Sequence, residues 1–326
     1  MTLLGVLIQS LVLVVILLTV FAFMTLIERK FLGYFHMRVG PNRTGPWGLL
    51  QPIADAIKSF VKEDIIPAGA DPFVFRLAPV ISVFTALAAW AVIPVGPPVE
   101  IAGRLVPLQV ADPPAGVLVT LAFSALSVYG ISLAGWASQS KYSLLGGMRA
   151  AAQLISYELA LAMSVLGVMM LAGSLRLSDI VAAQADRWFI ALQPLGFLIF
   201  LIAGIAETNR MPFDLPEAET ELVSGYSTEY SGMRFAMFMM AEYVAMITIS
   251  ALATLLYLGG WHGPAFLPPV AWFILKVSFF LFLFIWLRAT LVRVRYDRLM
   301  SFSWKVLVPL SVLNVILTAA GVALWG

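Results

Sequence analysis

The stretch Ala206–Gly232 reads AETNRMPFDLPEAETELVSGYSTEYSG and lies between two long apolar segments. No other part of the sequence is so acidic, because six carboxylates stand against the single base Arg210. Pro212 and Pro216 break any helix in its first half. We therefore expect an irregular loop followed by a short helix, in which carboxylates four residues apart share a face. The carboxylates of this acidic loop are Glu207, Asp214, Glu217, Glu219, Glu221 and Glu229.

The composition around the loop is typical of a membrane protein. The chain is 61% hydrophobic and 12% charged, with a mean hydropathy of +0.95, whereas a soluble domain is about 45–50% apolar. The formal charge of +2 is too small to indicate a nucleic-acid partner. Cysteine is absent, which excludes disulfides, thiolate-bound iron–sulfur clusters and cysteine-based zinc sites within the chain. Because His36 and His262 fall in separate loops, we expect neither a haem nor another metal site.

Eight apolar stretches are long enough to cross a bilayer, whose core of about 30 Å needs about 20 helical residues. The first is too long for a signal-peptide core and lacks a cleavage site, so we expect it to be retained. We predict an all-α polytopic membrane protein with a single transmembrane domain over residues 1–326. The predicted spans are Leu3–Ile27, Phe73–Val95, Ala115–Gly135, Arg149–Gly173, Trp188–Ala206, Met233–Leu258, Pro268–Leu287 and Ser303–Trp325.

The loops after the odd-numbered spans carry sixteen of the twenty Lys and Arg residues. By the positive-inside rule, these loops, including the acidic loop, face the cytoplasm, and both termini face the periplasm of a bacterial inner membrane. In the first of these loops, Leu49–Lys62 separates apolar from polar side chains at the helical period. This segment is too short to span and is predicted to be an amphipathic helix lying in the membrane interface.

Several charged residues need an explanation. Glu158 and Glu242 fall near the middle of predicted spans, where an ionised side chain is tolerated only if it faces protein or water. Both are expected to face an interior cavity, either as a proton relay or as a static ion pair with Lys276. Glu28 and Arg29 fit a stop-transfer flank at the end of the first span. The arginines after the seventh span fit a cytoplasmic anchor or, alternatively, an anion or headgroup site.

Four motifs carry a resemblance to a known family. They are ERKFLGYFHMRVGPNRTGPWGLLQPIADAIKSFVKED (28–64), GWASQSKYSLLGGMRAAAQLISYE (135–158), the acidic loop, and RAT (288–290) with RVRYDRLMSFSWK (293–305). In this order, over nearly the whole chain, they resemble the H subunits of respiratory complex I, the proton-pumping NADH–quinone oxidoreductase, and its mitochondrial counterpart, NADH dehydrogenase subunit 1. The related subunit of membrane-bound hydrogenases is similar in outline, but the extended acidic motif favours complex I.

The resemblance implies an eight-span subunit between the hydrophilic and membrane arms of a complex, where its helices wall a cavity for a lipid quinone, ubiquinone or menaquinone. Flavin and iron–sulfur clusters belong to soluble partner subunits, and small membrane subunits lead on to antiporter-like ones. Carried over by motif, the residues near the quinone entrance and tunnel are Glu28, Arg29, Asp55 and Arg288. Those implied in a proton-conducting funnel are Glu158, Glu207, Arg210, Asp214, Glu217, Glu219, Glu221, Glu242 and Tyr243, to which we add Lys276 as the intramembrane base.

The sequence departs from the family pattern at three positions: His36 replaces the usual Gln, Val292 the usual Pro, and Arg298 the usual Gln. Two hypotheses of other classes remain. An autonomous cation/proton antiporter is disfavoured, because such transporters often show inverted repeats and broken helices, and the sequence indicates neither. A passive scaffold for the soluble arm leaves Glu158 and Glu242 unexplained.

Overall fold

The computed structural model describes residues 3–101, 103–216 and 219–325. Only the backbone is described for Ile101, Arg104, Glu219, Thr220 and Trp325. In this part of the chain, seven helical stretches are long and apolar enough to cross a membrane, so the protein is an all-α, multi-pass membrane protein. They are α1 (Leu3–Phe35), α3 (Pro72–Ala89), α4 (Gly116–Ala137), α5 (Lys141–Ala172), α10 (Gly232–Tyr257), α11 (Pro269–Thr290) and the stretch made of α12 (Tyr296–Phe302) and α13 (Val308–Trp325).

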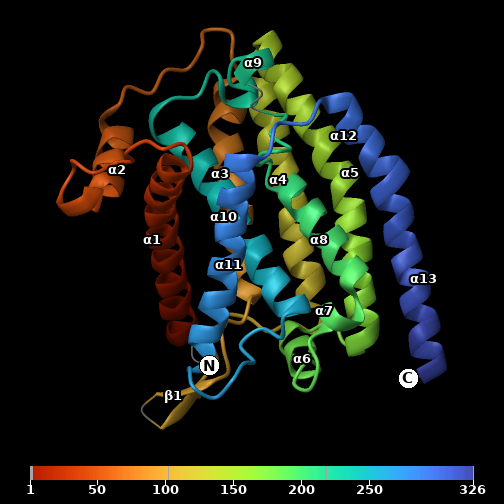
Figure 1. Cartoon of the computed structure of the whole chain (residues 1–326). Helices are drawn as coiled ribbons and strands as arrows, with labels where there is room; N and C mark the ends of the chain where they lie inside the picture. The colour runs from red at the N-terminus through yellow and green to blue at the C-terminus, as the bar shows by residue number, and fades with distance from the viewer. Residues whose placement is uncertain (1–2, 102, 217–218, 326) are drawn as a thin grey trace.

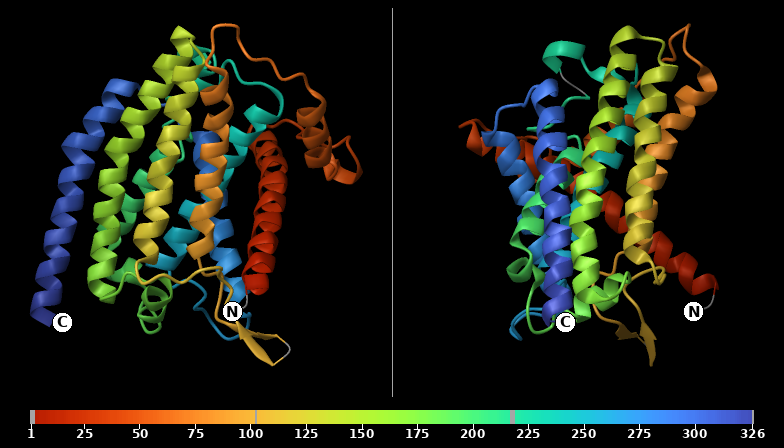
Figure 2. Two further views of the ribbon diagram at one scale, coloured as in Figure 1. Left: turned by 180° about the vertical axis from the view of Figure 1, so that it is seen from behind. Right: turned by 90° about the vertical axis from the view of Figure 1, so that its right-hand side faces the viewer.

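The helices form one bundle with two distinct ends (Figure 1). Both chain termini lie at the same end, together with α6 (Leu177–Ala182) and a small antiparallel hairpin of β1 (Val99–Ile101) and β2 (Arg104–Val106). The opposite end carries α2 (Gln51–Val61) and α9 (Glu219–Leu222), and the view from behind agrees (Figure 2). The acidic loop and the termini therefore lie at opposite ends of the bundle.

The fifth predicted span is not one continuous helix, which corrects the expectation of eight long ones. It divides into α7 (Phe189–Leu192) and α8 (Pro194–Glu207) around Gln193, whose φ of −131° and ψ of 59° are not helical. A proline disfavours the helical conformation of the residue before it, and Pro194 does so here. The fourteen residues of α8 reach only about 21 Å at about 1.5 Å per residue.

Three other spans begin or end in places that the sequence did not predict. Helix α1 continues past Ile27 to Phe35, and α5 begins at Lys141 rather than Arg149. The last stretch begins before Ser303, with α12 (Tyr296–Phe302), a π-helical turn (Ser303–Leu307) and α13 (Val308–Trp325). In each case charged or polar turns extend the helix beyond its apolar part, so hydropathy alone underestimates its length.

Helix α2 (Gln51–Val61) forms within the segment that the period predicted, after a short 3₁₀ turn, Pro46–Gly48. Pro52 stands in its first turn, where a missing N–H has no cost. One face carries apolar side chains that are 57–79% exposed, namely Ile53, Ile57, Phe60 and Val61.

Helices α5 and α10 form the centre of the molecule. In their most apolar stretches 56% and 61% of the residues are buried, against 17% in α1 and 22% in α4. Helices α3 and α4 approach closely at Gly130, where a Cβ would collide with Ser82 Oγ. The outer helices leave apolar side chains exposed, as lipid-facing helices do.

Candidate functional site

A buried ionic cluster joins four elements near the end of the bundle that carries the acidic loop. Glu28 of α1 is 2% exposed, and both of its carboxylate oxygens accept hydrogen bonds of 2.8 Å from Nη1 of Arg210 in the acidic loop. Arg288, in the last turn of α11, donates to the same carboxylate. An isolated carboxylate at this depth would be unstable, and two guanidiniums compensate it.

Arg210 extends the cluster to α10. Its Nε pairs with the carboxylate of Glu242, and its guanidinium carbon lies 4.2 Å from the centre of the Tyr243 ring. Burial lowers the pKa of the Arg210 guanidinium, but the carboxylates of Glu242 and Glu28 outweigh burial and raise it above its ordinary value. Arg210 is therefore a permanent cation shared by two carboxylates.

The course of the chain after α8 explains how an arginine reaches this place. Helix α8 ends at Glu207, and Asn209 takes a left-handed conformation with φ of 53°. This turns the chain inward, so that Arg210 is only 4% exposed. Pro212, the next residue but one, cannot donate the hydrogen bond that would continue a helix.

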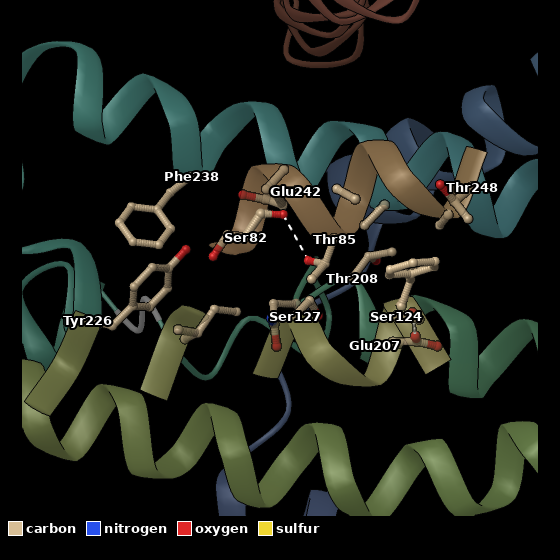
Figure 3. A pocket seen from close by; sticks show the side chains of 17 residues that line it. Ser82, Thr85, Ser124, Ser127, Glu207, Thr208, Tyr226, Phe238, Glu242 and Thr248 are labelled. Carbon is tan, nitrogen blue, oxygen red and sulfur yellow. Dashed lines mark hydrogen bonds between the residues drawn. The ribbon is translucent and has the colours of Figure 1, made fainter. Parts of the chain in front are cut away.

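A cavity lined by apolar side chains and by several hydroxyl groups adjoins the cluster through Glu242 (Figure 3). It offers about 60 Å³, enough for a few water molecules when each needs about 10–15 Å³ of such space. Glu207 lies against Ser124 of α4, which donates a hydrogen bond to it, and Glu242 lies across the cavity (Figure 3). The hydroxyl groups around the cavity come from Ser82, Thr85, Ser124, Ser127, Thr208, Tyr226 and Thr248.

The two cavity carboxylates have different surroundings. Glu242 touches both the cavity and Arg210, whereas Oε2 of Glu207 is buried without a hydrogen-bond partner among the described residues. A buried carboxyl oxygen without a protein partner is satisfied by water or by its own proton. The cavity can therefore hold a proton-accepting group and an ion-paired group on opposite walls.

Neither Glu158 nor Glu242 pairs with Lys276, which was the alternative to a proton relay. Glu158 is partly buried on α5, and no ion pair within the described ranges includes it or Lys276. The Lys276 ammonium instead donates to the carbonyl oxygens of Leu258, Gly260 and His262, at 2.6, 2.9 and 2.6 Å, and lies 4.4 Å from the Trp188 ring. These carbonyls follow the C-terminus of α10, whose partial negative charge favours a cation. The static pair with Lys276 was thus the wrong interpretation, because backbone carbonyls supply its partners.

The other predicted tunnel residues lie outside the cluster. Arg29 pairs with Asp55 of α2 at 2.6 Å, with half of the arginine side chain exposed. Asp55 also accepts a 3.0 Å hydrogen bond from Gln51. This pair fastens α2 to α1.

The predicted funnel residues in the rest of the acidic loop lie in different surroundings. Asp214 is partly buried, and Glu217 lies outside the described residues. Glu219 begins α9, but its side chain is outside the described part as well. Glu221 is exposed and pairs with Arg149 of α5 at 2.6 Å and with Arg293 at 3.6 Å. Among the side chains that the structure describes, the carboxylates of the loop therefore do not form one continuous group.

Sequence reasoning missed the neutral side chains of the site, Ser124 and Gln153. Gln153 of α5 is fully buried and hydrogen-bonds to the backbone of the acidic loop. The available signal was an amide within an apolar helix, which is costly unless it has partners. Among the described residues, no group of three or more His, Cys, Asp or Glu side chains could hold a metal ion.

Comparison with known proteins confirms the family indicated by the motifs. The sequence model described as NADH dehydrogenase matches residues 8–319. The second H subunit of NADH-quinone oxidoreductase from Geobacter sulfurreducens is 56% identical over 303 residues, covering 93% of this chain and 92% of that protein. The corresponding H subunit of Deinococcus deserti is 53% identical, covering 100% and 86%, and that of Thermomicrobium roseum is 54% identical, covering 97% and 95%. The chain belongs to the NADH dehydrogenase family.

Proposed function

We propose that this chain is a membrane subunit of a proton-translocating NADH–quinone oxidoreductase, in which it forms much of the quinone-access tunnel and a carboxylate funnel. The names of its relatives support the assignment to such a complex. The single observation that carries the coupling role is Glu242, because it belongs both to the Glu28–Arg210–Arg288 cluster and to the hydroxyl-lined cavity. A change of charge in the ionic cluster therefore changes the electrostatic energy of a proton in the cavity, and the reverse also holds.

The proposed quinone side lies between α1 and α11. Here Phe31 of α1 lies edge-on to Phe282 of α11, at 5.5 Å between ring centres, and Phe35 lies 6.4 Å from the same ring. Glu28 and Arg288 join the same two helices. Aromatic rings beside a charged pair suit a lipid quinone, ubiquinone or menaquinone, whose apolar tail and polar headgroup need different surroundings. Arg29 and Asp55 hold α2 beside this region.

The proposed proton side runs through Glu242 and Glu207 across the cavity, with Glu158 close enough for its charge to act on Glu207. Arg210 pairs with Glu242 and favours its ionised form, and Tyr243 contacts the Arg210 guanidinium. Asp214, Glu217, Glu219 and Glu221 form the acidic approach to the cavity. We leave Lys276 out of the path, because carbonyl oxygens at the other end of α10 engage its ammonium.

The same proposal covers the topology. The chain folds as a single transmembrane domain and crosses the membrane eight times, with α7 and α8 together making the fifth crossing and α2 lying in the interface. The charge of the loops supports a cytoplasmic acidic loop and periplasmic termini in a bacterial inner membrane. The partners are soluble quinone-site and iron–sulfur subunits, small membrane subunits leading to antiporter-like ones, and membrane lipid.

Replacement of Glu207 by Gln in the assembled complex tests the coupling role. We expect quinone-linked turnover and proton transfer to fall by about 10²-fold, the lower end of what a positioned proton-transfer group contributes. Reduction of an artificial acceptor by the hydrophilic arm should stay unchanged. Glu100→Gln, in the exposed hairpin at the other end of the bundle, is the control. Unchanged coupled turnover in Glu207→Gln rejects the funnel.

A further inference from the structure

Gln153 grips the acidic loop at two points with one amide group. Its Nε2 donates to the carbonyl oxygen of Ala206 at 2.7 Å and to that of Phe213 at 2.8 Å. Because carbonyl oxygens only accept, the NH₂ end of the amide must be the end that faces them. The other end, Oε1, is buried without a hydrogen-bond partner among the described residues. The side chain thus acts as a double donor.

The two carbonyls lie at the two ends of segment 206–213, which carries the site residues of the acidic loop. Ala206 lies in the last turn of α8, and Phe213 follows the turn that brings the chain back. Glu207, which faces the cavity, and Arg210, which enters the ionic cluster, lie between them. One neutral amide on α5 therefore fixes the distance between the two ends of segment 206–213.

Tyr157, one turn further along α5, contacts the Phe213 end of the same segment. Its ring centre lies 5.9 Å from that of Phe213, and its hydroxyl donates to the carbonyl oxygen of Leu299. Helix α5 is long and mostly buried, so it is a rigid base for both contacts. The position of the loop thus depends on α5 rather than on the α8 end alone.

We propose that Gln153 is a positioning residue that holds segment 206–213 so that Glu207 reaches the cavity while Arg210 reaches Glu28 and Glu242. Gln153 touches neither charged side chain by a hydrogen bond and acts through the backbone. Without the two hydrogen bonds from Gln153, the carbonyls of Ala206 and Phe213 each lose a buried partner, and the two ends of segment 206–213 can move apart. The inference rests on the proposed function for its effect on coupling, but the position of the loop can be measured independently.

Gln153→Met in the assembled complex is the test variant, because Met fills a similar volume and cannot donate. Gln184→Met is the matched control. Gln184 is also fully buried and also donates to two carbonyls, those of Ile180 and Leu255, at the end of the bundle away from the acidic loop. Both variants therefore lose a buried double donor, and Gln184→Met also loses the two hydrogen bonds that its amide oxygen accepts from the backbone N–H groups of Phe189 and Gly259, so it is the more severe of the two changes.

Hydrogen exchange of the backbone amides of residues 206–213 measures the loop directly. We expect exchange in Gln153→Met to rise roughly 5- to 30-fold, the factor given by losing two hydrogen bonds, and to stay unchanged in Gln184→Met. Protons translocated per NADH should fall in Gln153→Met and not in Gln184→Met. Electron transfer to an artificial acceptor should be unchanged in both.

The outcomes separate the two proposals. Unchanged exchange of the loop in Gln153→Met overturns the positioning role, whatever the activity. Equal loss of proton yield in both glutamine variants also overturns it, because the effect is then one of general stability. If Gln153→Met loosens the loop but Glu207→Gln leaves coupled turnover intact, the funnel is rejected while the grip of Gln153 on the loop stands.

Discussion

Arg210 serves two carboxylates at once, Glu28 on α1 and Glu242 on α10. Removing one partner of a buried ion pair costs about 3–5 kcal/mol, because it leaves an uncompensated charge. We expect Arg210→Met to lower stability by that amount. The double variant Arg210→Met/Glu242→Gln should regain much of the lost stability. It removes the unpaired charge of Glu242, and Glu28 keeps Arg288 as its partner. Thermal unfolding and the yield of assembled complex measure both variants.

The matched control is Arg295, whose side chain is 72% exposed and paired with Asp297. Arg295→Met should change stability by no more than about 0.5 kcal/mol. A double variant no more stable than Arg210→Met would show that Arg288 does not balance Glu28 without Arg210.

At the level of single residues, the position of the carboxylates in the spans pointed to them directly, whereas Arg210 and Arg288 were indicated only by the family resemblance, and no pairing among these residues was predicted. Glu242 was conspicuous because a charge within an apolar span is costly. Its partner Arg210 lies 32 positions away along the chain, in an irregular loop whose path no periodicity predicts. Ser124 and Gln153 are neutral and carry no charge signal, so only the folded chain brings them to the site.

At the level of elements, Glu221 fastens α9 to α5 through Arg149. The hydrogen bond from Arg149, followed by the charge of Arg293, holds the Glu221 pKa below its ordinary value despite some burial. A lowered folded pKa means that this stabilisation is complete above the unfolded value of about 4.3 and is lost as pH falls through the folded pKa. We therefore expect Glu221→Gln to be less stable than the unchanged protein at pH 7, by at most about 1 kcal/mol because the pair is partly exposed and screened.

The difference in Tm between the unchanged protein and Glu221→Gln, followed from pH 7 to pH 3, measures this contact. It should shrink toward zero below about pH 4 and also at high salt. Arg149→Met should show the same pH profile. A difference that grows on acidification would contradict the sign of the pKa shift.

Element ends depended on local chemistry that hydropathy ignores. Pro194 and the preceding Gln193 were visible in the sequence, and together they predict the break between α7 and α8, but the apolar run concealed it. The extension of α1 to Phe35 had the opposite cause. Its last turns carry Glu28 and Arg29, whose tertiary contacts stabilise helix that composition alone does not indicate.

At the level of the whole molecule, the two ends of the bundle should face different compartments. Because the chain has no cysteine, Glu100→Cys in the hairpin and Lys58→Cys in α2 can each report one end. We expect a membrane-impermeant thiol reagent applied to intact spheroplasts to label Glu100→Cys and not Lys58→Cys. Mass analysis of the purified protein measures the labelling.

Permeabilised cells are the control and should allow both positions to react, since both side chains are exposed. The reverse pattern in intact cells would invert the proposed orientation. The separation of the termini from the acidic loop was predictable because loop charge and span length are properties of the sequence, whereas the packing of α5 and α10 at the centre is not. The compartment that each end faces stays a prediction.

The ionic cluster is electrically neutral only while both of its carboxylates are ionised, since Arg210 and Arg288 bring two positive charges to Glu28 and Glu242. A proton that reaches Glu242 from the cavity leaves one positive charge in excess, in surroundings that screen it poorly. Neutrality returns when that proton leaves or when an anion comes within reach of the guanidiniums. An anion beside the guanidiniums therefore raises the proton affinity of Glu242, and protonation of Glu242 raises the affinity for the anion by the same factor.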